Sequence, residues 1–133
     1  MLLDTSVWIE YLALRSRVLR AAQLDAIDAA LADGEVCTVL PIYAELLSGA
    51  RHGDRELRTL LSALRFVDPD WSDVAVWERV ASLGESAFRR RLRIPGVVDR
   101  MIIAAAQDAG EAIWALDGPL RRLARAEGVA APL

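Results

Sequence analysis

Three short apolar stretches, separated by segments with a helical pattern, constrain the fold of this chain more than any other feature. They are "MLLD" (residues 1–4), "EVCTVL" (35–40) and "AIWAL" (112–116). Each is short enough to be read as a buried strand rather than a helix. Because strands that alternate with helices form parallel sheets, the pattern predicts a three-layer α/β/α sandwich around a small, mainly parallel sheet.

Apolar residues at helical spacing predict the helices between and after these strands. Their ranges are 7–14, 17–32, 41–51, 54–65, 71–91 with a break near Gly84, 97–109, and 119–127. The segment "RFVDPD" (65–70) is expected to be an extended link, and the tail "GVAAPL" (128–133) could add a strand. Ligand sites in such sheets gather beyond the carboxyl ends of the strands, which is where Asp4 and Asp117 lie.

The length of 133 residues and the 54% hydrophobic content are typical of one compact domain, expected to span residues 1–133. No apolar run approaches the roughly 18 residues of a membrane span, and no basic region leads into a secretory stretch. We therefore expect a cytoplasmic protein without membrane contact. Cys37 is the single cysteine, which excludes an internal disulfide, and its apolar neighbours indicate a buried strand position.

Two absences narrow the chemistry. All 16 basic residues are arginine, which excludes the lysine of a phosphate-binding loop, Schiff-base chemistry and a lysine-dependent receiver domain. His52 is the single histidine and lies where a helix is expected to end, so we expect a solvated residue rather than a catalytic base. Histidine acid–base catalysis and a structural zinc site are therefore excluded, which leaves carboxylates, hydroxyls and a hard metal ion.

Four carboxylates occupy positions that this topology brings toward one edge of the sheet. Asp4 and Asp117 follow predicted strands, whereas Glu45 and Asp99 lie on predicted helices. Each also has an ordinary explanation: Asp4 and Asp117 as helix caps, Asp99 as a favourable charge in a first helical turn, and Glu45 as an exposed helix residue. As a group they imply more, because carboxylates about 4 Å apart repel by roughly 4 kcal/mol at an effective dielectric near 20. Such a cluster persists when some members are protonated or a cation neutralises them, and oxygen ligands suit Mg²⁺ or Mn²⁺.

The stretch "VVDRMIIAAA" (97–106) places a carboxylate and a guanidinium at the start of an otherwise apolar helix. Either Asp99 points outward at the helix end, or a charged group lies opposite it. Arg100 is rotated by about 100° from Asp99 around the helix. We expect Arg100 to point elsewhere, toward phosphate or toward a surface partner.

The net charge of −3 argues against broad, nonspecific binding of nucleic acid, but the arginines are clustered. The three clusters are Arg89, Arg90, Arg91 and Arg93; Arg121, Arg122 and Arg125; and Arg51, Arg55 and Arg58. Each fits either a phosphate-binding face or a solvated helix surface. We take the first cluster as the candidate RNA contact.

At four places the residues resemble a known family. "LLDTSVWIEYL", "PIYAELLSGA", "GVVDRMIIAAA" and "AIWALDGPLRRLA" resemble, in order and spacing, the four acidic motifs of PIN-domain ribonucleases. The opening motif looks most like the VapC toxins of bacterial toxin–antitoxin pairs, and the resemblance covers nearly the whole chain. It implies a catalytic set of Asp4, Glu45, Asp99 and Asp117 with Ser6 as a supporting hydroxyl.

The resemblance implies a divalent-metal-dependent endoribonuclease that uses Mg²⁺ or Mn²⁺ and acts as the toxin of a type II toxin–antitoxin system, cleaving RNA to restrain translation and growth. Asp4 and Asp99 would hold the metal, and Glu45 and Asp117 would complete its shell or orient the attacking water. The expected partners are the RNA substrate, a cognate VapB-like antitoxin and a second copy of the chain. One departure is that Pro119 and Leu120 stand where many relatives carry another acid and an aromatic residue, which weakens the case for a second metal.

Other interpretations also bear on these residues. A haloacid-dehalogenase-type phosphatase needs a second acid where this chain has Ser6. A non-enzymatic PIN-like interaction module could instead bind a basic partner peptide through the acidic pocket. Trp8, Tyr11, Trp71 and Trp77, spread over predicted helices, independently favour an association surface and hence a homodimer, since aromatic residues are enriched at interfaces.

Overall fold

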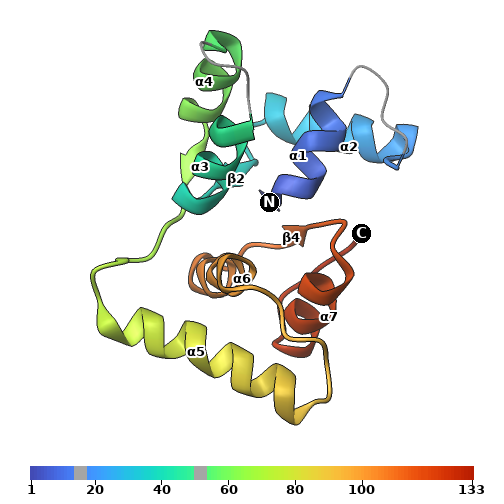
Figure 1. Ribbon diagram of the computed structural model, residues 1–133. Coiled ribbons are helices and arrows are strands. Elements are labelled where there is room, and N and C mark those ends of the chain that lie inside the picture. Colours follow the sequence, from blue (N-terminus) through green and yellow to red (C-terminus); the bar gives the residue numbers. More distant parts are fainter. Residues whose placement is uncertain (14–17, 50–53) are drawn as a thin grey trace.

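The structure is a computed structural model that describes residues 1–13, 18–49 and 54–133 (Figure 1). Its elements in chain order are β1 (Leu2–Leu3), α1 (Thr5–Leu12), α2 (Ala21–Ala32), β2 (Cys37–Thr38), α3 (Leu40–Gly49), α4 (Arg55–Ser62), β3 (Arg65–Phe66), α5 (Val74–Arg89), α6 (Val97–Ala109), β4 (Ile113–Trp114) and α7 (Gly118–Ala126). Among the described residues, no helix is both long and apolar enough to cross a membrane.

The sheet has the strand order β3-β2-β1-β4, and every neighbouring pair is parallel. Leu2 of the inner strand β1 is in register with Cys37 on one side and with Ile113 on the other. Because the strands are parallel, their carboxyl ends lie at one edge, and β1 and β4 run directly toward Asp4 and Asp117 there.

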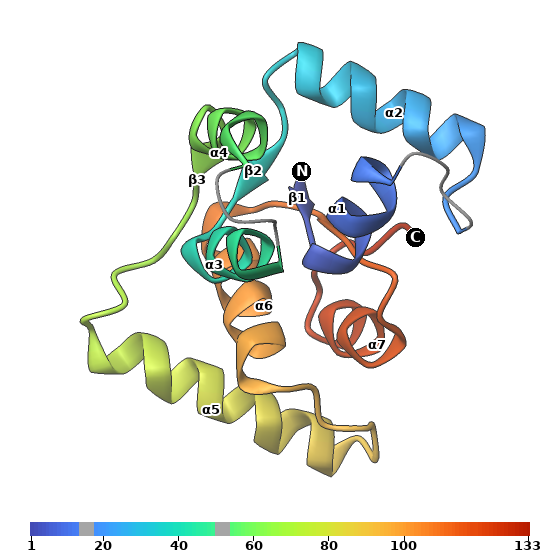
Figure 2. The same cartoon turned by 45° about the horizontal axis from the view of Figure 1, so that its top comes forward.

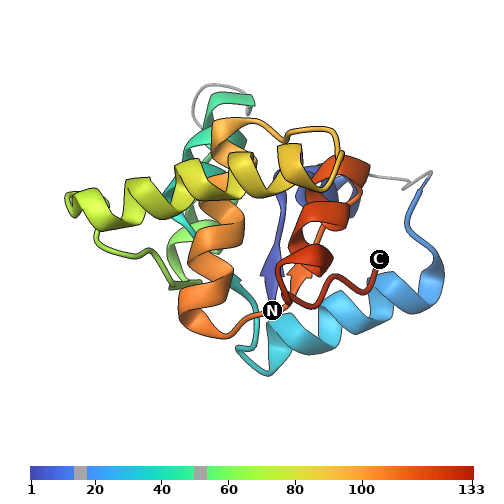
Figure 3. The ribbon, with the colours of Figure 1, turned by 90° about the horizontal axis from the view of Figure 1, so that it is seen from below.

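Helices cover this small sheet on both sides. Figures 1 and 2 place α5, α6 and α7 together on one side of the molecule and α2 and α4 on the other. Helix α5 is the outer helix of its side and crosses α6, as the view from below also shows (Figure 3). The predicted three-layer α/β/α arrangement is therefore confirmed.

The core explains why the short strands and α6 sit in the middle. Leu2, Leu3 and Ile113 are fully buried, and so is the run of α6 from Ile102 to Ala105. Burial of this kind stabilises a fold by roughly 25 cal/mol per Å² of apolar surface. Helix α6 then ends at Gly110, which takes a left-handed conformation with φ of 67° that a residue without Cβ adopts easily.

Three local expectations differ from the structure. Residues 65–66 are not merely a link but form the edge strand β3, paired with β2. Helix α5 runs unbroken through Gly84, and the missing side chain there makes room for Arg100 from α6. Residues 128–133 form no strand, although the amide of Ile113 donates a hydrogen bond to the Ala130 carbonyl at 2.8 Å.

Candidate functional site

Asp4 lies at the point where β1 turns into α1, and it is 94% buried. One of its carboxylate oxygens accepts hydrogen bonds from the Ser6 amide (3.1 Å) and from the Ser6 hydroxyl (2.5 Å). Asp4 is thus the N-cap of α1, as the sequence allowed. Burial nevertheless raises the pKa of the Asp4 carboxyl, against the lowering effect of the Ser6 bonds and with a smaller contribution from the charge of Glu45. The carboxylate is held in place but is costly to ionise.

Ser6 connects Asp4 to the neighbouring strand. While its hydroxyl donates to Asp4, its oxygen accepts a hydrogen bond from the Leu116 amide at 3.0 Å. Leu116 follows β4 and directly precedes Asp117. The Ser6 hydroxyl therefore ties the carboxyl ends of β1 and β4 together beside the carboxylates.

Asp99 is half-buried in the first turn of α6, and its carboxylate accepts a hydrogen bond from the Gly96 amide at 3.2 Å. Burial raises the pKa of Asp99 most, followed by the negative charges of Asp4, Asp117 and Glu45. The bond from Gly96 lowers this pKa only in part. Asp99 therefore lies within electrostatic reach of all three other candidate carboxylates.

Asp117 is exposed and is the N-cap of α7, where it accepts a hydrogen bond from the Leu120 amide at 2.8 Å. Pro119 follows in the first turn of that helix, which suits its missing amide hydrogen. The capping explanation of Asp117 is therefore confirmed, and its charge also acts on Asp99. The two roles do not compete, because the cap uses one oxygen and leaves the other available.

Glu45 is exposed on α3 and faces α1. Its carboxylate accepts a hydrogen bond from the Thr5 hydroxyl at 2.5 Å, which orients the side chain toward the residue next to Asp4. Sequence reasoning did not single out Thr5. The bond spans 40 positions of the chain, so no local sequence pattern predicts it. The only sequence feature that pointed to Thr5 was its position beside Asp4.

The charges of this edge are not balanced by protein cations in the described part of the chain. No ion pair between residues of the described ranges involves Asp4, Glu45, Asp99 or Asp117. Nor do any three His, Cys, Asp or Glu side chains of those ranges form a preassembled metal-binding group. Mg²⁺ does not need such a cage, since it is usually held by one or two carboxylates and keeps several waters. The donor set, a buried Asp4 and a half-buried Asp99 with two acids beside them, fits a hydrated divalent cation.

The candidate RNA-contacting arginines lie where α5 leads into α6. Arg89 ends α5, Arg90 caps it, and all four members of the cluster are exposed. Arg90 lies 3.6 Å from Glu127, and Arg89 lies 3.9 Å from Glu85. The predictions for Arg51, as part of another arginine cluster, and for His52, as a solvated residue, fall on positions outside the described residues.

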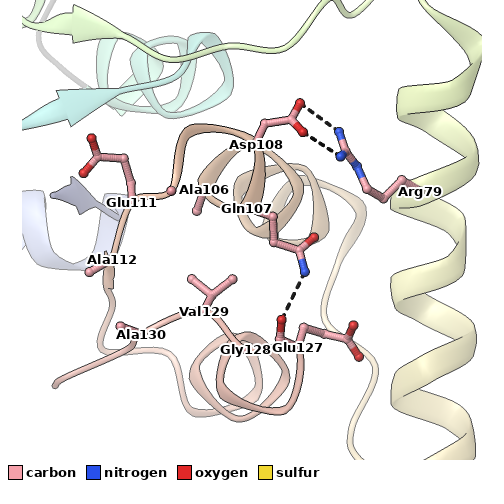
Figure 4. Close-up of a pocket in the computed structure, with 11 residues that line it drawn as sticks. Arg79, Ala106, Gln107, Asp108, Glu111, Ala112, Glu127, Gly128, Val129 and Ala130 are labelled. Carbon is pink, nitrogen blue, oxygen red and sulfur yellow. Dashed lines mark hydrogen bonds and ion pairs between the residues drawn. The ribbon is translucent and has the colours of Figure 1, made fainter.

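Another cavity, of about 580 Å³, lies at the opposite edge of the sheet, where Glu111 and Ala112 lead into β4 (Figure 4). Asp108 faces Arg79 there in a two-bond ion pair of 2.6 and 2.9 Å. Glu111 is likewise paired, with Arg65. Because these charges already have partners and lie away from the four carboxylates, we do not place the functional site in this cavity.

Comparisons with known proteins bear on the fold and on the family of the chain. A search of curated proteins gives no match. Two solved structures are similar over 98% of this chain: a crystal structure of FitAcB from Neisseria gonorrhoeae (19% identity, TM-score 0.68, 94% of that chain) and a structure of FitAB bound to an IR36 DNA fragment (18% identity, TM-score 0.65, 92% of that chain). At these identities the likeness concerns the fold. The family model of the PIN domain matches residues 1–126, and the chain therefore belongs to the PIN domain family.

Proposed function

We propose that this protein is a divalent-metal-dependent endoribonuclease and the toxin of a type II toxin–antitoxin pair. The observation that carries the proposal is the surroundings of Asp99, where burial and the charges of Asp4, Asp117 and Glu45 together disfavour ionisation. Carboxylates gathered in this way without a protein cation call for an external one. PIN domains are generally nucleases that use divalent metals, which supports the same conclusion.

Asp4 and Asp99 would hold Mg²⁺ or Mn²⁺, which lowers the pKa of a bound water and neutralises charge that develops on the phosphate. Ser6 fixes one oxygen of Asp4 by its amide and hydroxyl, and the other oxygen would serve the metal. Thr5 fixes Glu45 in the same manner from the adjacent position. Glu45 and Asp117, both exposed, would orient water or complete the metal's shell.

The partners proposed for this site follow from its charge. RNA would approach along the exposed arginines Arg89, Arg90, Arg91 and Arg93, whose positive charges attract its phosphates. A VapB-like antitoxin would inhibit the enzyme. Trp77, which is 41% exposed at the start of α5, supports a homodimer contact, whereas Trp8 is fully buried and is not available for one. We also propose that residues 1–133 act as a single domain.

Cleavage of RNA by the purified full-length chain tests the proposal. We expect cleavage with Mg²⁺ or Mn²⁺, none with EDTA, and a loss of at least about 100-fold in Asp99→Asn, since even outer-shell partners of a metal ligand contribute 10- to 100-fold. Asp108→Asn is the matched control, because Asp108 lies on the same helix but at the other cavity. Full activity of Asp99→Asn would refute the metal site. Binding of a basic peptide without cleavage in either metal would instead identify an interaction module.

A further inference from the structure

A groove of about 470 Å³ lies between the second half of α5 and the start of α6, beside the carboxylate edge. Two of its lining residues are apolar and exposed: Phe88 at 74% and Ile94 at 48%. Gly84, Arg89 and Arg100 line it as well. An aromatic ring exposed to this degree is unusual for a side chain that serves only packing.

Arg100 forms one wall of the groove through a close fit with Gly84. A Cβ at position 84 would lie 2.6 Å from Nη1 of Arg100, so any larger residue there would displace the guanidinium from this position. That Nη1 donates a hydrogen bond to the Val80 carbonyl at 3.2 Å. The buried Nε has no hydrogen-bond partner, and no carboxylate of the described residues pairs with the group. Glu85 also lines the groove, 3.9 Å from Arg89, so Arg100 is the groove cation that no described carboxylate pairs with.

The groove and the candidate metal site share the first turn of α6. Asp99 and Arg100 are consecutive, and a step of one residue turns the helix by about 100°. Asp99 faces the charges of Asp4, Asp117 and Glu45, while Arg100 reaches the other way, onto α5. A ligand bound at the carboxylates can therefore extend around one helical turn into the groove.

Further arginines lie in the chain segment between two residues that line the groove, Phe88 and Ile94. Arg91 and Arg93 are exposed there, whereas Arg90 donates to the Ser86 hydroxyl at 3.2 Å and lies near Glu127. Neither Arg91 nor Arg93 forms an ion pair with a described residue, and Arg91 turns the chain with a left-handed φ of 55°. Surfaces that bind single-stranded nucleic acid combine such arginines with exposed aromatic rings on which bases stack.

We propose that this groove binds a nucleobase of single-stranded RNA, with the base stacked on Phe88 and the flanking phosphates held by Arg89 and Arg100, which line it, and by Arg91 and Arg93 of the adjoining segment. The inference rests on the proposed nuclease function and names a substrate contact beside its site. A protein helix fits less well, because the exposed apolar residues Trp77 and Val74 lie at the far end of α5, roughly 16 and 21 Å along the axis from Phe88 at 1.5 Å per residue. A stable protein interface needs about 800 Å² on each partner.

Fluorescence anisotropy with a labelled single-stranded RNA oligonucleotide tests the groove, using the full chain in EDTA so that no cleavage occurs. Phe88→Ala should weaken binding by between about 5-fold and 150-fold, the range that corresponds to stacking on one aromatic ring. Phe88→Trp should bind as well as the native chain, whereas Phe88→Leu should bind as poorly as Phe88→Ala. Val74→Ala, which removes an exposed apolar side chain from the same helix, is the matched control and should bind normally.

A second oligonucleotide with abasic ribose positions separates base contacts from phosphate contacts. Phe88→Ala should not weaken its binding further, whereas Arg93→Gln should weaken the binding of both oligonucleotides alike. Native affinity of Phe88→Ala, or equal affinity of Phe88→Leu and the native chain, would refute stacking and favour an apolar peptide as the ligand. Absence of RNA binding by the native chain would also refute it. If RNA is cleaved while Phe88→Ala binds normally, the groove proposal fails and the nuclease proposal stands. If Phe88→Ala weakens binding as expected but the native chain cleaves no RNA, the groove proposal stands and the nuclease proposal fails.

Discussion

Replacing Asp4 by asparagine should have opposite effects on stability with and without metal. The amide of asparagine keeps an oxygen that can accept both bonds from Ser6, since both go to one oxygen of the native carboxylate. The substitution therefore preserves the cap of α1 and removes only the buried negative charge. Without metal the buried charge destabilises the fold, whereas with metal the carboxylate that carries it is a ligand.

The magnitude follows from three contributions. Taking a carboxylate out of water costs several kcal/mol in a real protein. Neutralising it gives up roughly 1 kcal/mol for each of the two hydrogen bonds and about 0.5 kcal/mol of attraction to the helix dipole. The remainder is a gain of about 1 kcal/mol for Asp4→Asn in EDTA. At a metal concentration 100 times the Kd, the native protein gains about 2.7 kcal/mol, so the order of stability should reverse.

Urea unfolding followed by circular dichroism, in EDTA and in saturating Mg²⁺, measures both effects. The pH dependence has a defined sign, because burial raises the pKa of Asp4 above its ordinary value of 3.8. Between pH 3.8 and the raised pKa, the folded native chain binds more protons than the unfolded chain, so its stability falls as pH rises through that window. The variant lacks this contribution from position 4, so its advantage in EDTA should grow with pH.

Asp73→Asn is the matched control. Asp73 caps α5 through the amide two residues later, at 2.9 Å, in the same pattern as Asp4, but it is exposed. It should show neither the gain in EDTA nor a change in the metal response. The reasoning is refuted if Asp4→Asn is destabilised in EDTA, or if its stability still rises with Mg²⁺ as the native protein's does.

Further predictions concern single side chains. Ser6→Ala should lower the free energy of unfolding by about 1–3 kcal/mol in urea titrations, since the Leu116 amide loses its acceptor. Burial and the bond to Asp28 raise the pKa of Tyr11 to about 12, so ultraviolet titration should show one late phenolate, stability should fall as pH rises from 10 toward 12, and Asp28→Asn should lower that pKa. Burial also raises the pKa of the Cys37 thiol, so its reaction with a disulfide reagent should proceed only at the rate of unfolding.

The elements that sequence could predict are those with a strong local signal. Helix α6 has the predicted bounds of 97–109, because an apolar period begins after Pro95-Gly96 and ends at Gly110. Asp4 and Asp117 could be placed at one edge of the sheet because both follow apolar strands. The common location of these two carboxylates could therefore be predicted from local patterns combined with the parallel topology.

The features that sequence missed depend on contacts between distant segments. Strand β3 consists of two exposed residues, Arg65 and Phe66, and is a strand only through its pairing with β2. Gly84 looked like a helix break, but its role is set by Arg100 on another helix. The bond of Thr5 to Glu45 joins two helices and leaves no periodic trace in the sequence. No local propensity contains this information.

The inner position of β1 has a consequence for synthesis of the protein. β1 is made before the other strands, whereas one of its two neighbours, β4, follows only after all of them, and the Ser6–Leu116 bond beside it spans 110 positions. Such distant pairing makes folding slow, because the long loop must close before the contact stabilises it. At roughly 5–20 residues per second of elongation, Asp99 and Asp117 are synthesised several seconds or more after Asp4. A nascent chain that has not yet reached Asp117 therefore carries no complete carboxylate edge.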